Sequence, residues 1–125
     1  MTNLKVIILG LAILISFCYN AYAQNYYRNG VTMTEQVRAE HILVPTEKQA
    51  KDLKTRIENG ESFEDIAREY SECPSGRNGG DLGYFTYGQM VKPFETAAFE
   101  TEVGKISDPI QTQFGWHLIK VIDKK

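Results

Sequence analysis

The sequence has little cysteine, with only Cys18 and Cys73 in 125 residues. Cys18 lies in an apolar N-terminal stretch that we expect to be removed, so Cys73 would be the only cysteine of the mature chain and no internal disulfide could form. Small exported domains commonly depend on disulfides for stability, so this one is expected to depend on packing instead. A lone thiol is a candidate functional group or a site of pairing with another chain.

Excess positive charge is also lacking. The chain has 14 Lys and Arg against 16 Asp and Glu, for a formal net charge of −2, and no basic run. Proteins that bind nucleic acid neutralise phosphates with a basic patch, so this class of partner is excluded. The histidines and Cys73 are widely separated and lack the compact spacing of metal ligands, so neither a metal nor another cofactor is expected.

No apolar run is long enough to cross a membrane comfortably. Val6–Phe17 is uncharged but has twelve residues, whereas a membrane-spanning helix needs about 20. Lys5 precedes this run, and Ala21-Tyr22-Ala23 follows with the small-x-small pattern of a signal peptidase site. We therefore predict a cleaved signal peptide over residues 1–23 and export, most commonly to a bacterial periplasm. An uncleaved membrane anchor is the less favoured alternative.

The remaining chain divides into a polar leader and one domain. Residues 24–36 have no hydrophobic periodicity, and we expect them to form a flexible leader. Residues 37–125 are expected to form one domain, which is short but long enough for a modest core.

Hydrophobic spacing predicts the elements of this domain. Residues 37–44 alternate as a strand, with His41 on the same face as Val37 and Ala39. Thr46 and Gln49 match a capping box at the start of a helix, and Ser62 is expected to begin a second helix that buries Tyr70. Further predicted segments are a loop over residues 71–80, a short strand or turn over 81–85, a helix over 92–99, and strands over 106–112 and 116–122. This order favours an α+β fold with a small antiparallel sheet of about four strands and three to four helices.

Three side chains stand out as candidates for chemistry. His41 lies on the first predicted strand, His117 on the last, and Cys73 in the glycine-rich loop. If the first and last strands were neighbours, these groups could converge. They could form a metal site, a hydrolase with a thiol nucleophile, or simply a hydrogen-bonded pair of core histidines beside a buried thiol. The residues alone favour the last of these.

Four motifs in order add a resemblance to a known family. They cover about Val37 to Ile122 and resemble the parvulin family of peptidyl-prolyl cis/trans isomerases. The four are Arg38-Ala39-Glu40-His41-Ile42-Leu43-Val44, the stretch from Ser71-Glu72-Cys73-Pro74-Ser75-Gly76 through Gly79-Gly80-Asp81-Leu82-Gly83, Gly88-Gln89-Met90-Val91-Lys92-Pro93-Phe94, and Thr112-Gln113-Phe114-Gly115-Trp116-His117-Leu118-Ile119.

The resemblance implies a parvulin-like fold, within the FKBP-like superfold, and a folding catalyst for Xaa-Pro bonds. It implies a proline pocket of Leu82, Met90, Phe94 and Phe114. It also implies a polar network in which His41 pairs with His117, Thr112 joins the histidines and Cys73 lies beside the isomerising amide. The expected partners are unfolded or newly exported polypeptides that contain proline, and the expected state is a monomer.

The expected mechanism is non-covalent. Rotation about an Xaa-Pro bond only has to break amide resonance, a barrier of about 18–20 kcal/mol, so Cys73 is expected to tune the polarity of the site rather than attack the amide. Phosphate-specific parvulins resemble this chain but carry a basic insertion after the first strand, and here Val44 leads directly into the helix with Lys48 as the only nearby cation. No preference for phosphorylated substrates is therefore expected. The alternative function is a holdase that binds proline-containing peptides with little catalysis.

Overall fold

Two strands from opposite ends of the domain form the centre of one antiparallel sheet. The computed structural model describes residues 36–125, and in this part of the chain β1 (Val37–Val44) pairs along its length with β4 (Gly115–Lys124). The edge strands are β2 (Asp81–Phe85) beside β1 and β3 (Ile110–Thr112) beside β4, which gives the order β2-β1-β4-β3. The α+β class and the four-stranded antiparallel sheet predicted from the sequence are confirmed.

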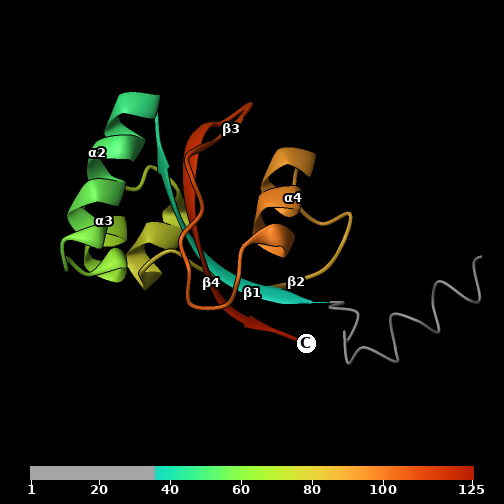
Figure 1. Ribbon diagram of the computed structural model, residues 1–125. Coiled ribbons are helices and arrows are strands. Elements are labelled where there is room, and N and C mark those ends of the chain that lie inside the picture. The colour runs from blue at the N-terminus through green and yellow to red at the C-terminus, as the bar shows by residue number, and fades with distance from the viewer. Residues whose placement is uncertain (1–35) are drawn as a thin grey trace, which may run out of the picture. The chain divides into compact units, whose positions relative to one another are not determined.

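Helices cover both faces of this sheet. α2 (Glu47–Glu58) and α3 (Phe63–Tyr70) lie on one side, and α4 (Lys92–Glu100) lies on the other (Figure 1). The two predicted N-caps are confirmed, because the Gln49 backbone N–H donates to the Thr46 hydroxyl at 3.2 Å and that of Asp65 donates to the Ser62 hydroxyl at 3.2 Å. Each hydroxyl satisfies a backbone donor that the helix itself leaves unpaired.

The alternation of β1 divides the core into two clusters. Ile42 and Val44 belong to the cluster under α2 and α3, whereas Val37 and Ala39 belong to the cluster under α4. His41 is 5% exposed and follows Val37 and Ala39 toward the α4 side, where it contacts Phe94. The period of two along a strand therefore assigns the histidine to one particular layer.

Three local predictions were wrong. Tyr70 was expected to be buried, but it is 41% exposed, since it is the last residue of α3 and its ring lies against the Arg56 guanidinium, 5.1 Å from the ring centroid. The stretch over residues 71–80 contains a short 3₁₀ helix, η1 (Pro74–Asn78), which ends at Gly79 in a left-handed conformation. The predicted strand over residues 106–112 is continuous only over Ile110–Thr112: Ile106 forms an isolated bridge with Lys120, and Pro109, which lies between them, lacks the N–H that a ladder requires.

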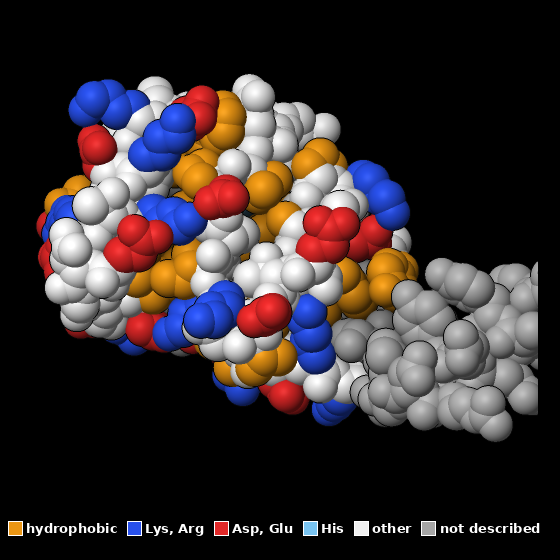
Figure 2. Space-filling model, in the orientation of Figure 1, with side chains coloured by type: hydrophobic (Ala, Val, Ile, Leu, Met, Phe, Trp, Pro, Cys, Tyr) orange, Lys and Arg blue, Asp and Glu red, His pale blue; other side chains and the backbone are white. Residues whose placement is uncertain are grey.

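The predicted signal peptide and most of the leader lie outside the described residues. Within residues 36–125, no helix combines the length and the apolar composition needed to cross a bilayer. On the face shown in Figure 2, acidic and basic side chains are interspersed with apolar ones, and neither sign dominates a large area.

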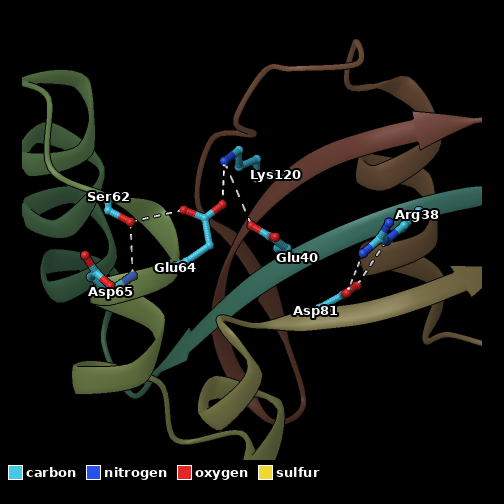
Figure 3. Close-up of polar contacts among 7 residues, drawn as sticks. All are labelled: Arg38, Glu40, Ser62, Glu64, Asp65, Asp81 and Lys120. Carbon is cyan, nitrogen blue, oxygen red and sulfur yellow. Dashed lines mark hydrogen bonds and ion pairs between the residues drawn. The ribbon is translucent and has the colours of Figure 1, made fainter.

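One buried carboxyl group connects α3 to the sheet. Lys120 on β4 donates to Glu64 on α3 at 2.7 Å, and its Nζ lies 3.9 Å from Glu40 Oε2 on β1 (Figure 3). The Glu40 side chain is 13% exposed, and its Oε2 has no hydrogen-bond partner among the described residues. Burial, together with the hydrogen bond and repulsion from Glu64, raises the pKa of Glu40 to about 7, whereas the Lys120 hydrogen bond lowers the pKa of Glu64 to about 2. The pair therefore holds one proton in mildly acidic solution.

Replacing Glu40 by Gln is expected to stabilise the protein at alkaline pH but not at acidic pH. A carboxyl group whose pKa is higher in the folded than in the unfolded state contributes its full stabilisation below the unfolded-state pKa. That contribution is lost as the pH rises through the folded-state pKa. The gain for Glu40→Gln should therefore grow from near zero at about pH 4.5 to about 1–3 kcal/mol at about pH 8. Urea unfolding of the wild type and of Glu40→Gln across this range measures the difference in their free energies of unfolding. The titration of His41 and His117 contributes to both proteins and cancels in this difference.

The matched control is Glu69→Gln, which removes the same charge from an exposed position on α3. Its effect should not change across the same pH range. A Glu40→Gln difference that is equally flat would show that Glu40 does not retain a proton in the folded protein.

Candidate active site

The two histidines face each other across the central strand pair. His41 Nδ1 lies 3.1 Å from His117 Nδ1, and the rings are stacked with their centroids 5.3 Å apart and an interplanar angle of 16°. The side chains lie diagonally across the pairing of β1 with β4, since Leu43 is opposite His117 and His41 is opposite Ile119. The predicted convergence of these residues in space is therefore what the sheet register produces, although they are 76 positions apart.

Hydroxyl groups extend this pair at both ends. His41 Nε2 lies 3.0 Å from Ser75 Oγ, and the Ser75 hydroxyl donates to Cys73 Sγ at 3.3 Å. At the other end His117 Nε2 lies 2.7 Å from Thr112 Oγ1, which also accepts the Phe114 backbone N–H at 3.1 Å. Thr112 thus contacts His117, as the family resemblance implied, and Ser75 is an additional member that the sequence did not single out.

Counting protons shows how this network is arranged. Only one proton fits between the two Nδ1 atoms, so one imidazole donates there and the other accepts. If His117 donates, its Nε2 accepts from the Thr112 hydroxyl, and His41 donates through Nε2 to Ser75, whose own proton points to Cys73. Every donor then has an acceptor, and the opposite pair of neutral tautomers, in which His41 donates at Nδ1 and His117 donates at Nε2, would carry no charge either.

Both imidazoles are neutral at neutral pH. Burial lowers the pKa of His41 to about 4, with repulsion from His117 as the second cause, and burial alone lowers the pKa of His117 to about 4. His41 and His117 are 5% and 4% exposed. The histidine pair therefore presents a polar but uncharged surface to its surroundings.

A pocket of about 520 Å³ opens over this pair. Its floor includes Phe94, whose ring meets both imidazoles edge-on at centroid distances of 5.5 Å and 5.3 Å. Leu82 and Met90 are half-buried in its walls, and Phe114 is 60% exposed at its rim. Of the eight site residues predicted from the sequence, seven line this pocket and Thr112 lies behind it, in contact with His117. The lining is His41, Leu43, Glu72, Cys73, Pro74, Leu82, Gln89, Met90, Val91, Phe94, Phe114 and His117.

Backbone hydrogen bonds attach one wall of the pocket to β1. The Glu72 N–H donates to the Leu43 carbonyl at 2.8 Å, the Leu43 N–H donates to the Ser71 hydroxyl at 3.1 Å, and the His41 N–H donates to the Gly80 carbonyl at 2.9 Å. These bonds join both ends of the segment that carries η1 to the strand that carries His41. Cys73 and Ser75 are therefore held at fixed positions relative to the histidine.

A buried carboxylate positions the opposite wall. Glu95 on α4 is 4% exposed, accepts the Gly88 N–H at 2.6 Å and pairs with Lys92 at 2.9 Å. These two contacts, the Gly88 N–H first, hold the pKa of Glu95 below its ordinary value. The turn that contains Gly88 is thereby tied to α4, which places Met90 beside Phe94. The sequence motifs did not single out Glu95, because no local pattern indicates that its carboxylate accepts the N–H of a residue seven positions earlier.

The other lining residues that sequence reasoning missed lie next to predicted ones. Glu72, Pro74, Gln89 and Val91 flank Cys73 and Met90 in the chain, and Leu43 follows His41 by one full strand period. Adjacency in a motif could have suggested them, whereas nothing local indicated that the Ser75 hydroxyl points to His41.

The geometry bears on the alternatives that the sequence left open. Within residues 36–125, no group of three or more His, Cys, Asp or Glu side chains is placed to hold a metal ion. The thiol of Cys73 contacts the Ser75 hydroxyl rather than an imidazole, so no base is in direct contact to activate it as a nucleophile.

Comparisons with known proteins agree with this geometry. A family model described as a PPIC-type PPIase domain matches residues 25–125. The foldase protein PrsA of Geobacillus sp. (strain WCH70) is 48% identical over 103 residues, which are 82% of this chain and 36% of that protein. The chain thus spans about a third of the length of the curated relatives it matches.

Solved structures show the same likeness. The crystal structure of the peptidylprolyl isomerase PrsA from Bacillus anthracis has a TM-score of 0.72 at 45% identity, over 74% of this chain and 43% of that one. The solution structure of the parvulin of Nitrosopumilus maritimus has a TM-score of 0.67 at 41% identity and is covered over its full length by 74% of this chain.

Proposed function

Since this chain belongs to the PPIC-type family of peptidyl-prolyl cis/trans isomerases, we propose that it acts as a folding catalyst on Xaa-Pro bonds of exported polypeptides. The observation that supports this most directly is the apolar pocket that ends on two neutral, hydrogen-bonded histidines. Export is inferred from residues 1–23 and from nothing in the described structure. Clients that are newly exported, and action as a monomer, belong to the same proposal.

The pocket suits a reaction that makes no covalent bond. Leu82, Met90 and Phe94 would grip the proline ring while Phe114 closes the exposed side, leaving the acyl side free to rotate. The planar amide is stabilised by charge-separated resonance, which a low-polarity site disfavours, whereas the twisted amide has lost that resonance. An apolar grip that excludes water therefore favours the transition state over the ground state.

The polar network would act where the carbonyl turns. A neutral network can donate or accept according to the direction of its proton chain, so it can accompany the rotating carbonyl without adding a charge to the apolar pocket. In this proposal His41 and His117 set the direction of that chain, Thr112 fixes one end, and Cys73 forms the end that faces the substrate.

Cys73→Ser is expected to keep substantial isomerase activity, within about tenfold of the wild type. The Ser hydroxyl can accept from Ser75 as the thiol does, and the non-covalent mechanism needs no nucleophile at this position. The measurement is the rate of isomerisation of a proline peptide, with peptide binding followed separately. Activity lost completely, with folding and binding intact, would instead support covalent attack by the thiol.

The lining also suggests how the enzyme treats phosphorylated substrates. No Lys or Arg lines the pocket in the described part of the chain, so nothing there matches a phosphate. The function is tested by the isomerisation rate of the full domain with a Ser-Pro peptide and with its phosphoserine counterpart. We expect catalysis of the unmodified peptide and no advantage for the phosphorylated one. Peptide binding without any increase in rate would select the holdase alternative.

A further inference from the structure

Within the described part of the chain, one carboxylate is the only charge at the mouth of the pocket. Among its lining residues in the described chain, Glu72 alone is charged at neutral pH, since burial keeps His41 and His117 neutral. Glu72 is exposed, and within residues 36–125 no Lys or Arg forms an ion pair with it. A substrate in this pocket therefore meets one uncompensated negative charge.

The backbone that carries this carboxylate is held in place. The Glu72 N–H donates to the Leu43 carbonyl, and the Ser71 hydroxyl accepts the N–H groups of both Leu43 and Cys73 at 3.1 Å and 3.4 Å. The Glu72 backbone and the Ser71 hydroxyl are thus attached to the end of β1, and Cys73 is attached to the same hydroxyl. The side chain can change its rotamer, but it projects from a fixed point directly beside Cys73.

Glu72 also lines a second hollow that adjoins the first. This groove, of about 280 Å³, lies between α2 and the end of α3, with Val44, Pro45 and Tyr70 among its lining residues. Both charged groups that line it in the described chain beside Glu72 are already paired. Arg56 donates to both Glu61 carboxylate oxygens at 2.6 Å and 2.8 Å and lies over the Tyr70 ring, and Asp52 pairs with Lys48 at 3.1 Å. A long aliphatic side chain could lie here and reach Glu72 with a charged end.

We propose that Glu72 makes the enzyme selective for clients that carry Lys or Arg next to the isomerising proline. The stem of that side chain lies along the adjoining groove, and its ammonium or guanidinium group pairs with the Glu72 carboxylate at the pocket mouth. This inference rests on the proposed function, because it assigns a substrate class to the same pocket. Charge complementarity and the shared lining residue are the two observations that carry it.

The expected preference is modest and depends on salt. An exposed ion pair should raise kcat/KM by a factor of about three to five. Replacing attraction by repulsion should make kcat/KM about tenfold higher for a Lys peptide than for a Glu peptide at low ionic strength. The ratio should decline toward one at about 1 M salt, where screening acts over about 3 Å.

The test uses two series of short peptides, Ala-Xaa-Pro-Ala and Ala-Ala-Pro-Xaa, in which Xaa is Lys, Gln or Glu. The ratio of kcat/KM for the Lys and Glu peptides is measured in the wild type, in Glu72→Gln and in the control Glu69→Gln. Glu69 is exposed, lies three positions before Glu72 and lines neither hollow. We expect a ratio of about tenfold in one series for the wild type and for Glu69→Gln, and a ratio near one for Glu72→Gln.

A wild-type ratio near one in both series would overturn the inference while leaving the proposed isomerase intact. A preference for Lys that persists in Glu72→Gln would overturn the assignment to this residue. The absence of catalysis with every peptide would overturn the proposed function and this inference with it.

Discussion

Gly80→Ala is expected to lower the free energy of unfolding by at least about 3 kcal/mol, which would leave little folded protein if the domain has ordinary stability. Gly80 has φ +86°, and a Cβ added there would lie 2.3 Å from the His41 carbonyl oxygen and 3.0 Å from the His41 nitrogen. Both clashes are with backbone atoms of β1, so no side chain can move aside to relieve them. The contact cannot simply open, because the Gly80 carbonyl accepts the His41 N–H.

Gly83→Ala provides the matched control. Gly83 also has a positive φ, of +67°, but an added Cβ would have nothing within 4 Å. Its substitution should cost only the backbone strain, about 1 kcal/mol. Denaturant unfolding of the two variants distinguishes the stability lost to backbone strain from the stability lost to the clash with β1. Equal destabilisation by the two substitutions would contradict the close approach of Gly80 to β1.

Met90→Ala is expected to reduce kcat/KM for a proline peptide by about tenfold to a hundredfold, the largest effect that we expect on catalysis from a substitution that leaves the fold intact. Met90 is half-buried in the pocket wall, where its side chain packs at the edge of the cluster beneath α4. Truncation widens the grip on the proline ring and admits water. Because the twisted amide depends on an apolar surrounding, kcat should fall as well as KM rise.

The control for this variant is Ile57→Ala, which truncates a partly buried side chain packed against the other core cluster. Both variants should lose a similar and small amount of stability, about 1–2 kcal/mol, measured by denaturant unfolding. Only Met90→Ala should lose activity. Equal kinetics in the two variants would mean that Met90 is a core residue with no part in holding substrate.

Short-range signals in the sequence predicted much of the fold. The alternation in β1 assigned His41 to its face, and the caps at Thr46 and Ser62 marked two helix starts, because these patterns depend on neighbours within one turn or one pleat. Predictions failed where an element ended. Tyr70 was misplaced at the last position of α3, and the strand before Thr112 was shortened at Pro109.

The sequence by itself determined which residues could form the site, since the motifs around His41, Cys73, Met90 and His117 each appear within a few positions. It could not determine how they touch. The register of β1 against β4 brings the two Nδ1 atoms to 3.1 Å, and η1 turns Ser75 between His41 and Cys73. The raised pKa of Glu40 and the unpaired charge of Glu72 likewise follow from burial and neighbours. Such properties depend on contacts between residues far apart in the chain, which only tertiary packing creates.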